Sequence, residues 1–175
     1  MMQQGIYMNL KELKQKVLKA QENADIASLY VLEQKAQDLF DEDELQAFYV
    51  NILDLALEGL TDALESHRLM DMNEVQDFAT LRALYEYAME HYHAGDITDA
   101  SALFEVLSGL TKDKEFSSSL KIHWIASSEG INLDDFISNI ADIDATQKAG
   151  KFYISVFQKE AQILLSDLKS DGSKK

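Results

Sequence analysis

Histidines and carboxylates are the side chains of this chain whose spacing bears on metal binding, because the chain contains no cysteine. Glu90 and His93 form one Glu-x-x-His motif, and Glu86 lies one helical turn earlier. This arrangement is typical of half of a carboxylate-bridged di-iron site, which needs a second Glu-x-x-His on another helix. The residues three positions before the other histidines are Leu64, Ala88 and Leu120. We therefore predict no metal and no cofactor, and interpret the motif as solvated helix surface.

No residue stands out as catalytic. Pairs of carboxylates recur throughout the acidic middle of the chain, so their spacing alone does not select a general acid and base. The chain has no glycine-rich phosphate loop, no Gly-x-Ser-x-Gly and no zinc-protease motif. We interpret His123, beside Trp124, as a core or boundary residue. We predict that the protein is not an enzyme, and a metal-dependent enzyme is the least favoured alternative.

The net charge of −15 is concentrated in one part of the chain. Residues 41–108 carry sixteen acidic side chains against Arg68 and Arg82, a net charge of −14. Nucleic acid is not expected as a direct partner, because phosphate binding requires clustered lysine and arginine. Two interpretations of the acidic segment remain open. It is a solvated, solubilising face, or it attracts a partner protein with a basic face.

Composition predicts an all-α protein. The 175 residues include no proline and only seven glycines, and alanine, leucine, glutamate, lysine and glutamine are abundant. No apolar run approaches 18 residues and the N-terminus lacks a signal peptide, so we expect a cytoplasmic protein without membrane insertion. We expect a flexible leader over residues 1–8, a single helical domain over 9–168 and a disordered tail over 169–175.

Three helices are predicted in the first part of the chain from their capping residues. Asn9 and Glu12 form a capping box for a helix over residues 10–22, and Asp25 begins a second that ends at Leu39 or Phe40. The first helix also has a basic side, but its thin apolar stripe favours core packing over a membrane surface. Asp41 and Glu44 box the third and longest helix, which runs to about His67.

Later helices follow from the same signals. Asp71 and Glu74 predict a capping box, with Met70 and Val75 as a hydrophobic staple, for a helix beginning near Met72. Thr111 is expected to cap a helix that buries Phe116, Leu120, His123 and Trp124, and Asn132 a shorter one. Asp144 and Gln147 box a final amphipathic helix whose inward residues are Phe152, Tyr153, Val156, Phe157, Leu164 and Leu168.

The segment from Leu81 to Leu110 predicts two amphipathic helices folded back on each other. Apolar residues recur at helical spacing on both sides of Gly95. Gly95 can adopt the left-handed conformation that closes a helix, and Asp96 is suited to the N-cap of the next. With almost no linker between them, the two helices must pack antiparallel.

This hairpin resembles one tetratricopeptide repeat. Leu84 takes the bulky first position, Tyr87 and Ala88 the large–small pair, and Ala100 and Phe104 the small and aromatic positions of the second helix. The sequence departs from the pattern at His91, Leu107 and Lys112. Gly130 lies 35 residues after Gly95 and fits a degenerate second repeat, although Asp135 replaces its small residue. The fold class is therefore a single-domain antiparallel helical bundle or a short array of such hairpins, with seven or more helices.

The wider segment MNEVQDFATLRALYEYAMEHYHAGDITDASALFEVLSGL is similar to the helix-rich flagellar export co-chaperone family. That family binds and steadies the flagellin chaperone. The resemblance implies a chaperone or co-chaperone of a flagellar or type III export system that holds a partner protein. The alternative is a structural or assembly subunit of a larger complex, in which the hairpin buries a permanent neighbour.

One face of the first hairpin helix is the predicted partner-binding site. It carries Arg82, Tyr85, Met89 and Tyr92, which in the repeat family line the concave groove. Tyrosine and methionine also supply large, adaptable contact areas at binding sites. The alternative is that this face packs inside the protein, against the long third helix or the C-terminal helix.

Overall fold

The computed structural model describes residues 8–159 and 161–163, and within them the chain is all-α, as predicted. Its elements are α1 (Leu10–Glu22), α2 (Ile26–Leu39), α3 (Glu42–Glu65), α4 (Val75–Ala94), α5 (Ile97–Leu110), α6 (Lys114–Ser128), α7 (Leu133–Asp135), a π-helix η1 (Phe136–Ile140) and α8 (Ile143–Ala149). Residues 1–7 and 169–175, where a leader and a tail were expected, lie outside the described part. Met8 packs against the core. No described helix has the length and apolarity needed to cross a membrane.

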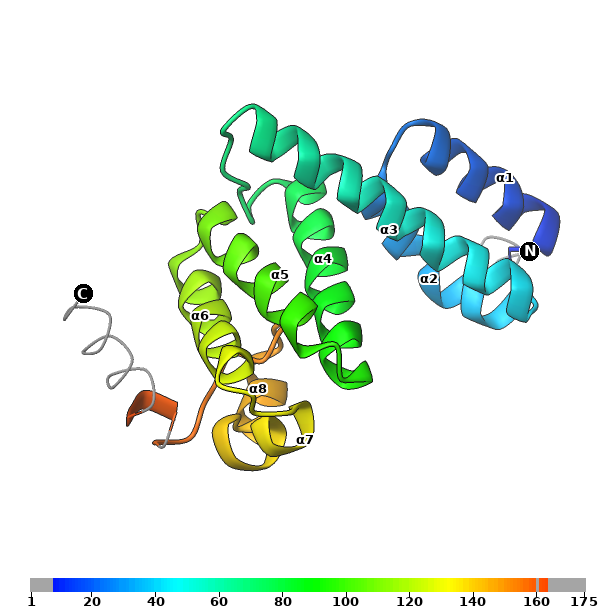
Figure 1. Cartoon of the computed structure of the whole chain (residues 1–175). Helices are drawn as coiled ribbons and strands as arrows, with labels where there is room; N and C mark the ends of the chain where they lie inside the picture. The colour runs from blue at the N-terminus through cyan, green and yellow to red at the C-terminus, as the bar shows by residue number, and fades with distance from the viewer. Residues whose placement is uncertain (1–7, 160, 164–175) are drawn as a thin grey trace.

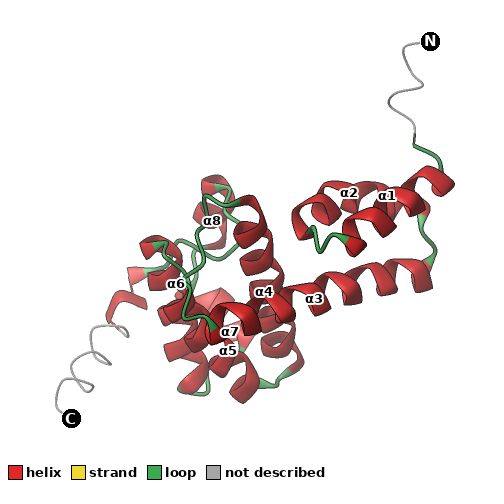
Figure 2. Ribbon diagram, turned by 90° about the horizontal axis from the view of Figure 1, so that it is seen from above, coloured by secondary structure: helices red, strands yellow, loops and turns green. Residues whose placement is uncertain are grey.

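The helices form two neighbouring groups joined by α3 (Figure 1). The α1–α2 hairpin lies beside the first half of α3, and Figure 2 shows these three helices together on one side of the molecule. The chain then turns back into α4, and α4, α5 and α6 pack next to one another in order. The short elements α7, η1 and α8 gather at the far ends of α4 and α6. The fourth helix therefore lies between the two groups.

The first three helices begin where their caps predict. The Asn9 side chain accepts a hydrogen bond from the Glu12 N–H at 2.8 Å, and the Asp25 side chain accepts one from the Ser28 N–H at 3.0 Å. Both hydrogen bonds of the capping box of α3 form between Asp41 and Glu44. These side chains satisfy N–H groups that the first turn of a helix leaves without partners.

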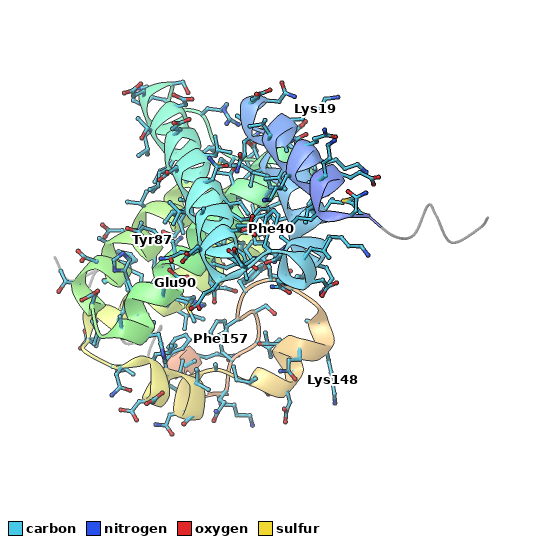
Figure 3. All side chains as sticks on the ribbon, turned by 90° about the vertical axis from the view of Figure 1, so that its right-hand side faces the viewer. Lys19, Phe40, Tyr87, Glu90, Lys148 and Phe157 are labelled. Atoms are coloured by element: carbon cyan, nitrogen blue, oxygen red, sulfur yellow. The ribbon has the colours of Figure 1, made fainter. Side chains whose placement is uncertain are left out.

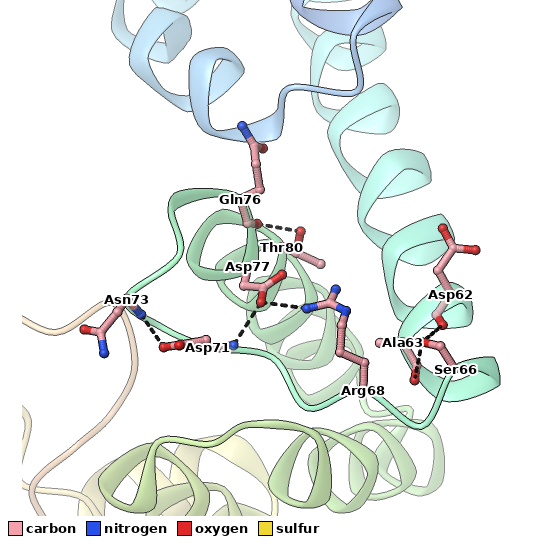
Figure 4. A network of polar contacts seen from close by, with 9 residues as sticks. All are labelled: Asp62, Ala63, Ser66, Arg68, Asp71, Asn73, Gln76, Asp77 and Thr80. Atoms are coloured by element: carbon pink, nitrogen blue, oxygen red, sulfur yellow. Dashed lines mark hydrogen bonds and ion pairs between the residues drawn. The ribbon is translucent and has the colours of Figure 1, made fainter.

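The start of α4 differs from the prediction. The helix begins at Val75 instead of near Met72, and the expected capping box between Asp71 and Glu74 does not form. Asp77 accepts hydrogen bonds from the Asp71 N–H and from the Arg68 guanidinium, both at 2.9 Å (Figure 4). The Asp71 carboxylate instead accepts from the Asn73 N–H at 2.9 Å. Asp77 therefore holds the preceding segment as a loop.

The expected staple between Met70 and Val75 is also absent. Val75 is 67% exposed, whereas Met70 is buried and its backbone pairs with the end of α5. The Met70 N–H donates to the Leu110 carbonyl at 2.7 Å, and its own carbonyl accepts from the Lys112 N–H at 2.9 Å. This bridge fixes the α3–α4 loop against the chain between α5 and α6.

Caps in the last part of the chain are shifted by two residues from two of the predictions. Asp113, not Thr111, caps α6, and its side chain accepts from the Phe116 N–H at 2.8 Å. Asp142, not Asp144, caps α8. In each pair the capping residue immediately precedes the first helical residue, where its side chain reaches the N–H groups of the first turn. Asn132 caps α7 as predicted.

The predicted final helix through Phe152 and Phe157 is wrong for residues 151–158, which form no helix. Gly150 ends α8 with a φ of 70°. The following segment lies against α6 and η1 and pairs with the backbone on both sides of Ala141. Asp142 N–H donates to the Val156 carbonyl at 2.8 Å, and Gln158 N–H donates to the Ile140 carbonyl at 2.8 Å. Leu164 and Leu168 lie outside the described residues.

Two glycines determine how α4 meets its neighbours. Gly95 has a φ of 89° and closes the α4–α5 hairpin, as predicted. Gly59 lies where α3 crosses α4, and a Cβ there would lie 3.4 Å from the Thr80 Cγ2. That distance is at the near limit of ordinary van der Waals contact, so Gly59 marks the point where α3 lies against α4.

Asp77 is buried, and we expect its carboxylate to stabilise the fold through the two hydrogen bonds it accepts. We expect Asp77→Ala to lower the free energy of unfolding by about 1–3 kcal/mol, because it removes the acceptor of a part-buried N–H and of Arg68. Urea denaturation measures the change. Asp62→Ala, at an exposed position on α3, is the matched control and should change stability by less than about 0.5 kcal/mol. Equal effects of the two substitutions would contradict this role.

Candidate partner-binding groove

Two of the four predicted partner-binding residues lie in the core, which corrects the prediction. Tyr85 is 3% exposed and Tyr92 is 1% exposed, so a partner cannot reach either side chain. Tyr92 packs against Phe104 and Phe136 and donates to the Ile131 carbonyl. The physical reason is the central position of α4: its apolar residues are covered on several sides, by α5 and by the C-terminal part of the chain. Arg82 and Met89 stay partly exposed.

Tyr85 belongs to a buried hydrogen-bond chain. The His123 Nδ1 lies 2.6 Å from the Ser119 carbonyl, which can only accept, so Nδ1 carries the proton. The His123 Nε2 then accepts from the Tyr85 hydroxyl at 2.8 Å, and the Tyr85 oxygen accepts from the Ile154 N–H at 3.1 Å. His123 is therefore the core residue that the sequence predicts, and this chain ties residues 151–158 to α4 and α6.

Arg82 joins α4 to α2. Its Nε lies 2.9 Å from the Glu86 Oε1, its Nη2 lies 3.2 Å from the Glu33 Oε1, and its guanidinium stacks 4.0 Å from the centre of the Tyr30 ring. Tyr30 donates to the Glu86 Oε2 at 3.2 Å. Burial, followed by the Glu86 charge, raises the pKa of Tyr30, so its hydroxyl remains a donor.

The third helix enters the same network through Tyr49. Its hydroxyl donates to the Glu33 Oε2 at 2.8 Å and accepts from the Gln37 side chain at 2.8 Å. Glu33 therefore connects α3 and α4 through a single carboxylate. These five contacts between helices hold α2 beneath the space that opens between α3 and α4.

That space is an open groove of about 840 Å³. From their crossing at Gly59, α3 and α4 diverge, and the groove lies between the first half of α3 and the second half of α4, with α2 at its floor and α7 at one end. Its partly exposed apolar side chains come from three elements and are Tyr49, Val50, Leu53, Tyr87, Met89 and Leu133. Tyr87 and Glu90 are marked on α4 in Figure 3.

The charge of the groove is acidic. Glu33, Glu86 and Glu90 line it, and Arg82 neutralises part of the charge of the first two from below. Glu90 is exposed and forms no ion pair with any other residue that the structure describes. Glu44 and Asp77 of the acidic segment pair with Lys14 and Arg68, but most of its carboxylates are exposed on α3, α4 and α5. An apolar surface with an unpaired carboxylate rim suits a ligand that is both apolar and basic.

The histidines and carboxylates that line the groove do not form a cluster of metal ligands. Within residues 8–159 and 161–163, no three histidine, aspartate or glutamate side chains come together as possible metal ligands. Glu90 and His93 lie at the rim of the groove, with Glu86 one turn earlier, as the helical spacing predicts. His123 is fully buried and has no path to a substrate.

The contributions of α2 and α3 to this site are not evident from the sequence. Tyr30, Glu33 and Gln37 follow Ile26 at helical spacing along one side of α2, and in the sequence they read as ordinary surface residues. The one sequence signal for this site is Tyr30, an aromatic residue three positions before Glu33 on the same helix. Only the fold shows that this side faces Arg82.

Acid should destabilise the protein through His123. Burial lowers the pKa of His123 to about 4 from an ordinary value of 6.5. Below pH 6.5 the unfolded chain binds a proton that the folded chain does not, so stability is complete above that pH and falls as pH decreases toward 4. The loss should reach about 2 kcal/mol at about pH 5.

Urea denaturation at several pH values, with His123→Gln as the control, isolates this effect. Carboxylates titrate in both proteins, so the difference in how their free energies of unfolding change with pH is due to His123. We expect the variant to be less stable at neutral pH but to have a shallower decline between about pH 6.5 and about pH 5. Identical slopes would show that His123 does not remain neutral in the folded protein.

The burial of Tyr85 and Tyr92 predicts a loss of stability when both become alanine. Truncating a buried aromatic residue typically costs about 3–5 kcal/mol, so Tyr85→Ala with Tyr92→Ala should melt far earlier than the parent protein or not fold. Tyr87→Ala with Met89→Ala, on the partly exposed groove side of the same helix, is the matched control. Similar melting temperatures for the two double variants would contradict the observed packing.

No known protein family, curated protein sequence or solved structure was found to match this chain. The resemblances to the tetratricopeptide repeat and to the flagellar export co-chaperone family therefore stay predictions. The hairpin itself is observed: Leu84, Ala88, Ala100 and Phe104 are all buried where α4 packs on α5.

Proposed function

We propose that this protein is a non-enzymatic binding module that holds another protein with a basic face. The proposal rests on the groove between α2, α3 and α4, which combines exposed apolar side chains with carboxylates. Monomeric proteins usually expose apolar residues singly, so a hollow that gathers several of them marks a binding surface. A chaperone or co-chaperone of a flagellar or type III export system is the specific role we propose, on the resemblance described above.

The charge distribution supports a basic partner. Asp54, Glu58 and Asp62 follow one another at four-residue spacing on exposed positions of α3. Like charges at this spacing destabilise a helix by a few tenths of a kcal/mol each. A surface that retains such repulsion suits long-range attraction of a cationic protein, which acts mainly on the association rate.

A structural subunit of a larger complex is the alternative, and exposed apolar residues outside the groove favour it. Val31 is 81% exposed on α2, and Phe78 is 42% exposed on α4. The two functions differ in the behaviour of the isolated protein. A chaperone should stay monodisperse alone, whereas a subunit that has lost a permanent neighbour should aggregate.

Photo-crosslinking from the groove tests the proposal. A photoreactive residue replacing Met89 should capture one discrete protein from native lysate, and the same residue at Glu105, exposed on α5, should not. The captured protein is then purified and mixed with the unmodified chain. Raising salt from about 10 mM to about 150 mM should slow association severalfold, because screening weakens steering between opposite charges.

Several outcomes would contradict this function. Equal capture from positions 89 and 105 would mean that the groove is not the contact surface. A rate that does not change with salt would leave the acidic segment as a solubilising face only. Aggregation of the isolated chain, relieved by a co-purifying neighbour, would favour the structural subunit.

A further inference from the structure

We infer that the groove receives one amphipathic helix of the partner, with lysine or arginine beside its apolar side. This inference rests on the proposed function and specifies the partner segment. The two walls of the groove are themselves helices, and each presents residues at helical spacing. On α3 these include Val50 and Leu53, and on α4 they include Glu86, Met89 and Glu90.

The groove offers no sheet edge to which an extended peptide could add as a strand. An added strand needs a sheet edge with unpaired N–H and C=O groups. The walls here are the first half of α3 and the second half of α4, and before the last turn of α4 their backbone groups bond within each helix. A bound helix satisfies its own backbone groups and needs only side-chain contacts, so it is the segment that these walls can accept without leaving polar groups unpaired.

The size of the groove fits a short helix. The lining residues of α3 run from Gln46 to Leu53, a rise of about 10 Å along the helix axis. Two turns of a partner helix cover that distance and place anchors at positions i, i+3 or i+4, and i+7. Leu53 and Met89 on opposite walls offer apolar contacts, and the unbranched methionine side chain adapts to different anchors.

The charges fix the polar edge of the partner helix. Glu33 and Glu86 are already engaged by Arg82, whereas Glu90 is exposed and has no ion pair among the described residues. A lysine or arginine beside the apolar anchors can reach Glu90 without disturbing Arg82. An acidic helix of the same shape would meet repulsion from all three glutamates.

A synthetic peptide tests the inference on the full-length protein. The probe is a fluorescein-labelled amphipathic helix of about 18 residues, with leucines at helical spacing and lysines along both edges. One control peptide has the same composition in a permuted order that destroys the apolar face, and another replaces lysine with glutamate. Fluorescence anisotropy at near-physiological salt should show at least about tenfold tighter binding of the probe than of either control, which corresponds to about 1.4 kcal/mol.

Matched charge reversals locate the binding. Glu90→Lys should weaken probe binding at least about fivefold, whereas Glu105→Lys, an equal change of net charge on α5, should alter it less than about twofold. Both positions are exposed, and circular dichroism should show unchanged folding. Equal effects of the two reversals, tighter binding of the permuted peptide, or no binding of the probe would overturn the inference.

The result can be separated from that of the proposed function. If Met89 crosslinks a discrete partner but the helical probe does not bind, the protein holds its partner through another kind of segment. If the probe binds in the groove but no partner is captured from that position, the helix preference stands and the proposed function fails.

Discussion

The contact of Arg82 with Glu33 is the interaction on which the arrangement of the two helix groups depends. Arg82 lies on α4, and Glu33 lies on α2 and also accepts a hydrogen bond from Tyr49 on α3. One arginine and one carboxylate thus connect three helices. The ion pair is part-buried, and Tyr30 covers the guanidinium with its ring. Hydrogen bonds to charged groups in such surroundings are stronger than those between exposed groups.

The groove is a consequence of this arrangement. At Gly59, α3 lies against α4. Away from this crossing, the contacts of Arg82, Glu33 and Tyr49 hold α2 beneath the groove. The helices diverge over their remaining length, so side chains such as Val50 and Met89 stay accessible because no element of the described chain covers them. The C-terminal segment 151–158 instead closes the opposite part of the core. Its Ile154 N–H donates a hydrogen bond to the buried Tyr85 hydroxyl.

Local signals predicted the first half of the fold well, and tertiary contacts explain the failures. Asn9, Asp25 and Asp41 cap their helices through bonds to residues three positions away, which a sequence shows directly. The start of α4 depends on Asp77 bonding to the loop before it, and Met70 depends on a backbone bridge to residues near 111. The spacing of Phe152 and Phe157 is compatible with a helix or with an irregular buried segment, and the helix ends before them at Gly150.

The prediction that Tyr85 and Tyr92 contact a partner was wrong because α4 is central, so apolar residues on more than one side of it are buried. Arg82 and Met89 lie near the groove, but Glu33 and Tyr49 could be placed there only by the packing of α2 and α3.

Methyl NMR of the methionines is the most direct test of whether a partner occupies the groove. Met89 lies in the groove. Met70 is buried where the α3–α4 loop pairs with the chain between α5 and α6, and Met72 lies in the same loop. Signals of ¹³C-methyl-labelled methionine can be assigned by single Met→Leu substitutions and followed as the captured partner is added. We expect the Met89 signal to shift or broaden and the Met70 signal to stay in place. A Met89 signal unchanged at saturation, with shifts at Met72 or Met8 instead, would contradict it.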